Sequence, residues 1–246
     1  MGNEAGEWII YGMDSDDPEC IHTVDEAIAY INEVGFLPLF KNEISGFSLE
    51  ERTIAEHWWC DDVEKDPWMW RTVIARRGEI AYGKFFDRKA GFISKKWFPY
   101  FANYRRDGYD FDALYDDGKA ARKLKKIMDH FMEEQADREW YSNELKLLAG
   151  FGKDGEKGFD GAITNLMMMT YLCNSDFKKR KNKQGREYGW DVAIYATPEH
   201  LWGREYVTSQ YPEKPEDSWE MIVAHMRKLH PDVTQEQIRK VLGIRK

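Results

Sequence analysis

The stretch Ser175–Pro198 reads SDFKKRKNKQGREYGWDVAIYATP, and it decides how the rest of the chain is interpreted. Six basic residues fall within nine positions that contain no acidic residue: Lys178, Lys179, Arg180, Lys181, Lys183 and Arg186. They surround Lys183-Gln184-Gly185, a turn signal between two runs that are typical of strands. The sequence therefore predicts a β-hairpin with a strongly positive tip.

The rest of the chain has the opposite charge. Its 246 residues carry a formal net charge of −8, and 42% of them are hydrophobic, as in globular proteins. An acidic chain disfavours indiscriminate nucleic-acid binding, so any contact with DNA has to be confined to a patch. No apolar run approaches the roughly 20 residues that span a bilayer. Trp8–Tyr11 is too short for the core of a signal peptide. Three scattered cysteines predict no disulfide framework. We therefore expect a cytoplasmic protein that makes no membrane contact.

Helix caps, glycines and alternating runs divide the chain into segments. Residues 1–22 read as an extended lead-in. An N-terminal unit over 23–117 is expected to contain four helices, a hairpin and a polar loop: Thr23 to Gly35, Ser48 to about Trp59, Asp66 to Gly78, the strands Ile80–Phe86 and Ala90–Ser94, the helix Lys95–Arg105 and the loop Arg105–Asp117. The rest is expected to contain a bridging helix, a second helix–helix–hairpin unit and a helical tail: Lys119–Trp140 within 118–140, then Asn143–Ala149, Phe159–Tyr171, the basic hairpin and Pro198 to Gly203 within 141–203, then Trp219–Leu229 and Gln235–Leu242 within 204–246.

Short helices followed by a hairpin are typical of a winged helix, a DNA-docking module, and this order occurs twice. We therefore predict an α+β, predominantly helical fold with tandem winged-helix-like units and hairpin wings. In such a unit the wing cations contact phosphates, and Thr164 and Asn165 on the preceding helix face the groove. The alternative is a solvated, charged hairpin that protects a sheet edge from aggregation.

Four tryptophans lie close to four carboxylates in WWCDDVEKDPWMW, residues 58–70. A pocket for an extruded base is lined by aromatic rings that stack on the base, and the candidates here are Trp58, Trp59 and Trp68. The carboxylates nearest to them are the candidate catalytic groups, because a carboxylate stabilises a developing sugar cation or activates water: Asp61, Asp62 and Glu64. The alternative is ordinary: tryptophans in the core, and acids that cap helices or face solvent.

No motif indicates a metal or a cofactor, and we expect neither. The acidic loop 107–117 lacks the glycine and the terminal glutamate of a calcium loop. His57-x-x-Cys60 has no second ligand pair at zinc spacing. The chain contains no phosphate-binding glycine motif and no dinucleotide fingerprint.

Two long segments carry a resemblance to a known family. They are WYSNELKLLAGFGKDGEKGFDGAITNLMMMTYLCNSDF, residues 140–177, and GREYGWDVAIYATPEHLWG, residues 185–203. Together with AYGKFFDRKAGFISKKWFPYF and INEVGFLPLF, they resemble proteins related to AlkZ, a family of winged-helix DNA glycosylases that act on alkylated or crosslinked bases. The resemblance runs from about Thr23 to Gly203, and it implies tandem winged-helix units and duplex DNA as the partner.

The same resemblance leaves enzymatic activity open. The glycosylases carry a Gln–aliphatic–Gln motif after the first helix, and if VGFLPLF aligns with it, Pro38 and Phe40 occupy the two glutamine positions. Neither side chain positions water. Two other functions stay open: a protein-interaction scaffold, and a ligand-sensing regulator with a pocket enclosed by Trp58, Trp68 and Trp97. No feature of the sequence predicts the oligomeric state.

Overall fold

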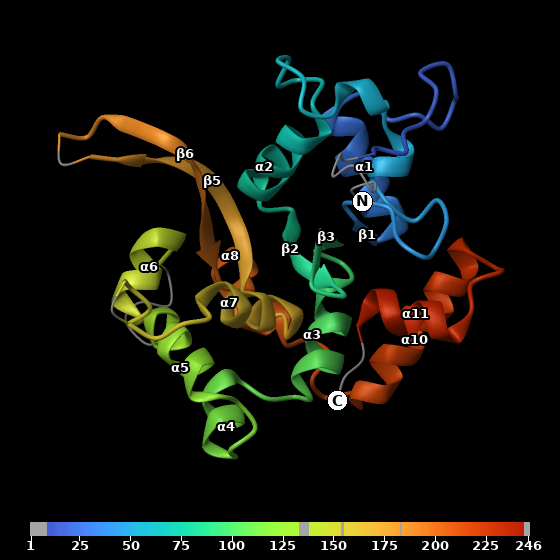
Figure 1. Cartoon of the computed structure of the whole chain (residues 1–246). Coiled ribbons are helices and arrows are strands. Elements are labelled where there is room, and N and C mark those ends of the chain that lie inside the picture. The colour runs from blue at the N-terminus through green and yellow to red at the C-terminus, as the bar shows by residue number, and fades with distance from the viewer. Residues whose placement is uncertain (1–8, 133–137, 154, 183, 244–246) are drawn as a thin grey trace. The chain divides into compact units, whose positions relative to one another are not determined.

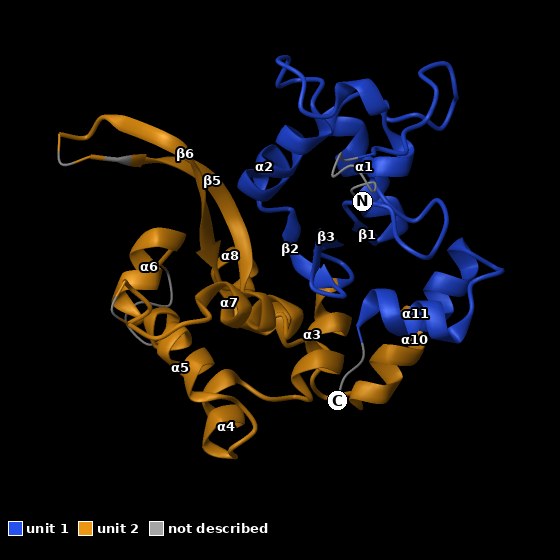
Figure 2. Cartoon of the chain, in the orientation of Figure 1, with its two compact units in different colours: residues 1–97, 223–244, 246 blue, residues 98–222, 245 orange. Residues whose placement is uncertain are grey.

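The computed structural model describes residues 9–132, 138–153, 155–182 and 184–243 (Figure 1). Part of the expected lead-in, residues 1–8, lies outside this range. The chain divides into two compact units (Figure 2), of which unit 1 comprises residues 1–97 and 223–244 and unit 2 comprises residues 98–222. Both contain helices and antiparallel strands, so the chain is of the α+β class. None of the described helices is long and apolar enough to cross a membrane.

The described residues of unit 1 form three helices that lie wholly within it, three strands and two short 3-10 turns: α1 (Val24–Val34), β1 (Phe36–Pro38), η1 (Glu50–Arg52), η2 (Ala55–His57), α2 (Pro67–Arg77), β2 (Ile80–Phe86), β3 (Lys89–Ser94) and α11 (Gln235–Leu242). Unit 2 contains these described elements: α3 (Phe98–Arg106), α4 (Phe111–Asp116), α5 (Arg122–Met128), η3 (Asp129–Phe131), β4 (Trp140–Tyr141), α6 (Ser142–Leu148), α7 (Phe159–Met168), β5 (Cys173–Lys181), β6 (Glu187–Ala196), α8 (Pro198–Trp202) and α9 (Arg204–Val207). The long helix α10 (Pro215–Leu229) begins in unit 2 and ends in unit 1.

The helices α1 and α2 begin and end where the sequence predicts. The Thr23 hydroxyl accepts a hydrogen bond from the N–H of Glu26, and the Glu26 carboxylate accepts one in return from Thr23, which completes a capping box. Asp66 caps α2, and Pro67 occupies its first position. Gly35 and Gly78 end the two helices with positive φ values of 85° and 69°.

A tight turn sets the pairing of β2 and β3 in unit 1. Asp87 and Arg88 both have positive φ, 47° and 64°, and join β2 to β3 as a two-residue hairpin loop. β1 pairs antiparallel with the other edge of β3, so the strand order is β1-β3-β2. The inner residues of these strands, among them Phe36 and Phe92, are fully buried. The predicted hairpin is confirmed, with β3 beginning one residue early.

The helix predicted from Ser48 to about Trp59 is wrong. Only the turns η1 and η2 form there, because tertiary hydrogen bonds compete with the helical ones. The buried carboxylate of Glu50 accepts the backbone N–H groups of Tyr11 and Lys41, at 2.8 and 2.7 Å. Thr53 is extended and bridges to Ile21. A capping sequence therefore does not suffice to form an α-helix where a residue of its first turn, here Glu50, is held by hydrogen bonds to other segments.

Unit 2 is built around three antiparallel strands of the sheet, in the order β5-β6-β4. β5 and β6 form a long hairpin that extends beyond the helices α6 and α7 of the same unit (Figure 1). At its base α6 contacts both β6 and β4, and α5 packs against α7. Leu145 and Leu166 are fully buried in this core.

Two predictions for unit 2 are wrong. Lys119–Trp140 does not form one helix, since α5 covers only Arg122–Met128 and Trp140 pairs with Tyr195 as part of β4. Residues 133–137 lie outside the described part of the chain. The loop predicted over Arg105–Asp117 contains a helix, α4, because Phe111 and Leu114 are buried on one of its faces. Strand pairing and two apolar side chains thus override the local signals.

We predict that Gly35→Ala destabilises unit 1 more than Gly78→Ala does. Both glycines cap a helix at positive φ, but a Cβ at Gly35 lies 2.4 Å from the Trp97 ring, whereas one at Gly78 has nothing within 4 Å. Gly78→Ala is expected to cost about 1 kcal/mol for the backbone alone. Gly35→Ala is expected to cost about 2–4 kcal/mol, because it adds a steric clash in a packed core. Urea unfolding of both variants measures the difference, and equal losses contradict the prediction.

Candidate nucleic-acid interface and a buried polar centre

The wing, defined as residues 173–196 of β5, β6 and their connecting turn, is closed by Asn182. The Asn182 side chain accepts the backbone N–H groups of Gln184 and Arg186, at 3.0 and 2.9 Å. Gly185 follows with a φ of 76°, which suits glycine. The turn and the two flanking strands therefore form where the sequence predicts. Lys183 lies outside the described residues.

The wing cations differ in how far their charge is neutralised. Lys178 forms an ion pair with the buried carboxylate of Asp176, at 3.1 Å. Arg180 is half-buried, and its guanidinium lies over the Tyr188 ring at 5.5 Å. Lys179 and Arg186 are exposed, and their side chains form no ion pair within the part of the chain that the structure describes. The side chain of Lys181 is not described. Of the described wing cations, Lys179 and Arg186 are thus both exposed and without an ion pair.

The helix before the wing, α7, does not present all its predicted residues. Asn165 is exposed, as expected. The expected exposure of Thr164 is wrong: its side chain is buried, and its hydroxyl donates to the carbonyl oxygen of Asp160 at 2.7 Å. Helical periodicity places Thr164 one position away from the solvent-facing Asn165, which turns it toward the core.

A groove with a volume of about 590 Å³ lies beside the wing. Its basic lining residues come from α6, from the glycine-rich loop that follows, and from β5: Lys146, Lys153, Lys157 and Arg180. Two acids, Glu156 and Asp160, also line it. Glu156 already pairs with Lys123 and Lys126, so the groove keeps an excess of positive charge.

The structure brings the three candidate stacking residues together in unit 1. The Trp58 and Trp59 rings lie 5.9 Å apart, and those of Trp59 and Trp68 lie 6.4 Å apart. Phe40 joins them, with ring centroids 5.4 Å from Trp58 and 6.2 Å from Trp68. Trp58 is buried, whereas Trp59 is 46% exposed. Trp97 instead stacks on His225 at 4.2 Å.

The three candidate catalytic carboxylates are all exposed: Asp61, Asp62 and Glu64. Asp62 accepts the Glu64 N–H at 3.2 Å and lies 3.4 Å from the Lys65 ammonium group. The buried carboxylate beside the rings is instead Asp66, which accepts the N–H groups of Trp59 and Trp68. Asp66 therefore holds the tryptophan segment in place as a helix cap. Among the described residues, no three His, Cys, Asp or Glu side chains converge where a metal ion would bind.

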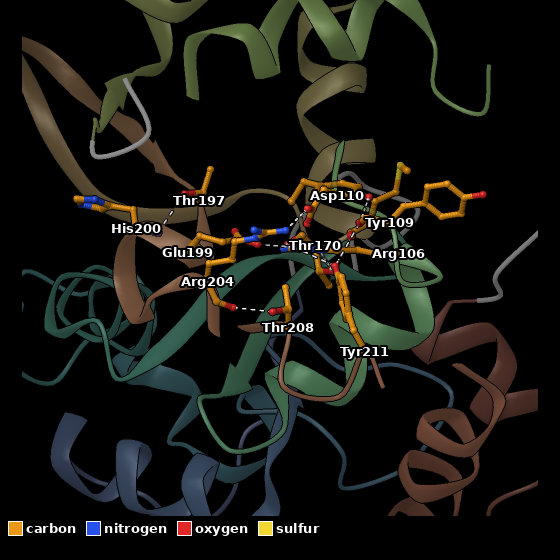
Figure 3. A network of polar contacts seen from close by, with 12 residues as sticks. Arg106, Tyr109, Asp110, Thr170, Thr197, Glu199, His200, Arg204, Thr208 and Tyr211 are labelled. Carbon is orange, nitrogen blue, oxygen red and sulfur yellow. Dashed lines mark hydrogen bonds and ion pairs between the residues drawn. The ribbon is translucent and has the colours of Figure 1, made fainter. Parts of the chain in front are cut away.

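Unit 2 contains a buried polar centre, Arg106, which is only 1% exposed (Figure 3). Its guanidinium donates to the Glu199 carboxylate and, at 2.5 Å, to the carbonyl oxygen of Thr170. Its third nitrogen, Nε, donates to the Thr170 hydroxyl at 3.3 Å. Burial by itself lowers the pKa of Arg106, but the Glu199 carboxylate and Tyr211 more than offset this, so the pKa lies above its ordinary value. The Arg106 side chain is therefore charged and holds three chain segments together.

A cavity with a volume of about 720 Å³ adjoins this centre. Its lining is mostly apolar, with acids near Arg106: Phe111, Met128, Phe131, Tyr171, Asp110 and Glu199. All three guanidinium nitrogens of Arg106 already donate hydrogen bonds within the protein. The role of Arg106 is consequently structural.

Sequence reasoning missed the Arg106 centre and the groove. Nothing in the local sequence around Arg106 distinguishes it from the neighbouring Arg105, because its partners come from distant segments. The groove did carry a signal: GFGKDGEKG, residues 150–158, combines glycines with two lysines next to the start of a helix.

The family of the chain follows from comparison with known proteins. The model of the AlkZ-related family matches residues 21–243, nearly the whole chain. The chain therefore belongs to the AlkZ-related family. No curated protein and no solved structure gives a significant match.

We predict that Glu199→Gln destabilises unit 2 by about 2 kcal/mol or more, because it leaves the buried Arg106 charge without a counter-ion. Asp110→Asn is the matched control. It makes the same chemical change in the same cavity but removes an exposed pair with Arg204, and is expected to cost less than about 1 kcal/mol. Thermal and urea unfolding compare the variants. A Glu199→Gln protein as stable as the control contradicts the structural role.

Proposed function

We propose that this protein binds duplex DNA through its wing, as a winged-helix member of a family related to DNA glycosylases. The observation that carries the proposal is the charge of the wing: Lys179 and Arg186 are exposed on a projecting hairpin, and no described residue pairs with their side chains. Each of the two units has an order of helices followed by a hairpin, which supports the winged-helix interpretation.

The charge balance favours a polyanion as the partner. Over residues 176–191, six cations stand against three acids, a local charge of +3, in a chain whose net charge is −8. Only one of the described wing cations, Lys178, is neutralised by an ion pair. A local positive charge on an acidic protein attracts DNA to that site and repels it elsewhere.

The groove beside the wing supports a path for the phosphate backbone. Three exposed lysines line it together with Arg180 of the wing. The amide groups at the start of α7, a helix of 10 residues, lie along the same groove. Lysines and helix amides are both common phosphate partners. We place the DNA backbone across this groove, with Asn165 of α7 toward the bases.

The proposal is DNA binding without base release. Phe40, which takes one of the two glutamine positions if VGFLPLF aligns with the glycosylase motif, packs against Trp58 and Trp68. The candidate carboxylates are exposed, so no low-dielectric environment activates them. The tryptophan cluster is then a packing feature that supports the segment rather than a base pocket.

A protein-interaction scaffold is the second candidate. Leu147 and Leu148 of α6 are 66% and 54% exposed, and the acid Asp160 interrupts the positive charge at the start of α7. Exposed leucines beside a charged groove suit a protein partner. The two candidates differ in salt dependence, because only phosphate binding releases condensed counter-ions.

We predict that the double variant Lys179→Glu/Arg186→Glu loses duplex binding. The wild-type log–log salt slope is expected to reflect about −0.9 for each phosphate that is neutralised. Because the variant removes about two such contacts and adds repulsion, its affinity at low salt should fall more than tenfold. Fluorescence anisotropy of a labelled 20-base-pair duplex, titrated at several salt concentrations, measures both.

The matched control is Lys214→Glu/Lys228→Glu. It changes the net charge by the same amount at exposed lysines outside the wing and the groove. This control is expected to bind within about threefold of wild type at moderate salt, because neither lysine belongs to the wing or lines the groove and salt screens the added charge. Equal losses in both double variants, or none in either, remove the wing from the proposal.

We also predict no release of alkylated bases above the buffer background. The assay incubates the protein with duplex containing an alkylated purine and then cleaves the abasic sites. Base release that disappears in Asp61→Asn/Asp62→Asn would contradict binding without catalysis, and would place hydrolysis at the exposed carboxylates. Release that survives in this variant would contradict it equally, and would place catalysis elsewhere in the chain.

A further inference from the structure

Trp190 on β6 is 89% exposed, more than any other large hydrophobic side chain in the described ranges. Tryptophan has a large apolar surface, and most tryptophans in folded proteins cover it. Leaving about nine-tenths of such a side chain in water gives up the free energy that its burial would contribute, so this exposure points to a function.

A β-bulge sets the position of Trp190. Lys179 pairs with Asp191, and the next residue of β5, Arg180, pairs with Tyr188. Gly189 and Trp190 are therefore left without paired residues between these two ladder positions. Gly189 has a φ of 72°, a backbone conformation that suits glycine. Bulges of this kind re-aim a side chain away from the regular pleat.

The neighbours of Trp190 are those of a nucleic-acid surface. Lys179 lies across the strand pair, exposed and without an ion pair among the described residues. Tyr188, two residues away, is 49% exposed, and the Arg180 guanidinium lies over its ring. Cations interleaved with exposed aromatic rings are the features that proteins use to bind nucleic acid with unstacked bases.

We propose that Trp190 stacks on an unpaired or unstacked base of the DNA that the wing binds. The inference rests on the proposed function and deepens it: the ligand is duplex DNA with a local break in base stacking, such as a bulged nucleotide. The wing cations hold the backbone on either side, and the indole ring occupies the place of the missing stacking partner.

The test uses the full chain and two duplexes, one fully paired and one identical except for a single bulged nucleotide. Wild-type protein should prefer the bulged duplex. Trp190→Ala should lose that preference by about 5- to 150-fold, the range for stacking one base on an aromatic side chain. Its salt slope should stay unchanged, because no phosphate contact is lost. Trp190→Phe keeps a ring and should retain most of the preference.

Tryptophan emission gives a second measurement. DNA should quench the wild type more than Trp190→Phe, because the stacked indole is missing from the variant. The high exposure of Trp190 means that neither variant should change the melting temperature, and this controls for folding. Equal binding of both duplexes by wild type, with the wing still needed for affinity, overturns the inference and leaves the proposed function intact.

Two other outcomes also decide the matter. If Trp190→Ala weakens both duplexes equally, Trp190 makes a general contact rather than a base stack, and the inference is wrong. If neither duplex binds to the wild type and the Lys179→Glu/Arg186→Glu variant behaves identically, the proposed function fails and the inference fails with it. An exposed tryptophan would then fit the centre of a protein–protein contact better.

Discussion

The buried charge of Arg106 is the constraint on which unit 2 depends. A guanidinium group that is only 1% exposed has to be matched by acceptors, and these come from the carbonyl and hydroxyl oxygens of Thr170 and from the carboxylate of Glu199. Thr170 lies just before β5, and Glu199 lies just after β6. The same side chain therefore fixes the base of both wing strands. Thr170 has a φ of 64°, unusual for a β-branched residue, and its two hydrogen bonds to Arg106 hold that conformation.

The sequence predicted the elements whose signals are local. Capping side chains and glycines fixed α1, α2 and α11, and alternating runs with turn residues fixed both hairpins. It failed where distant partners decide. Glu50 accepts the backbone N–H groups of Tyr11 and Lys41, so the capping box of Ser48 and Glu51 begins no α-helix. Of the candidate interface, the cations of the wing were evident as a charge run. The bulge at Gly189 was not, because it depends on strand register, and the burial of Thr164 was missed although the helical period places it beside the buried Ile163.

The aromatic side chains around Phe40 show that membership of the family does not settle which chemical groups the chain carries. The chain belongs to the AlkZ-related family over nearly its whole length. Yet Phe40 packs against Trp58 and Trp68, and a phenyl ring there neither donates nor accepts a hydrogen bond to water or to a base. Membership of a family does not by itself supply the groups that carry out its chemistry. In this chain the surface charge and the exposed ring of Trp190 carry more functional information than the tryptophan-rich segment does.

The division of the chain has a consequence for how it is made. Unit 2 is one continuous stretch, whereas unit 1 joins residues 1–97 to residues 223–244. Within unit 1, Trp97 stacks on His225, and Gln237 donates to the carbonyl oxygen of Glu43. On the ribosome these contacts have to wait until α10 and α11 emerge, while residues 98–222 are free to fold first. Residues 1–97 thus lack part of their unit until residues 223–244 have been synthesised.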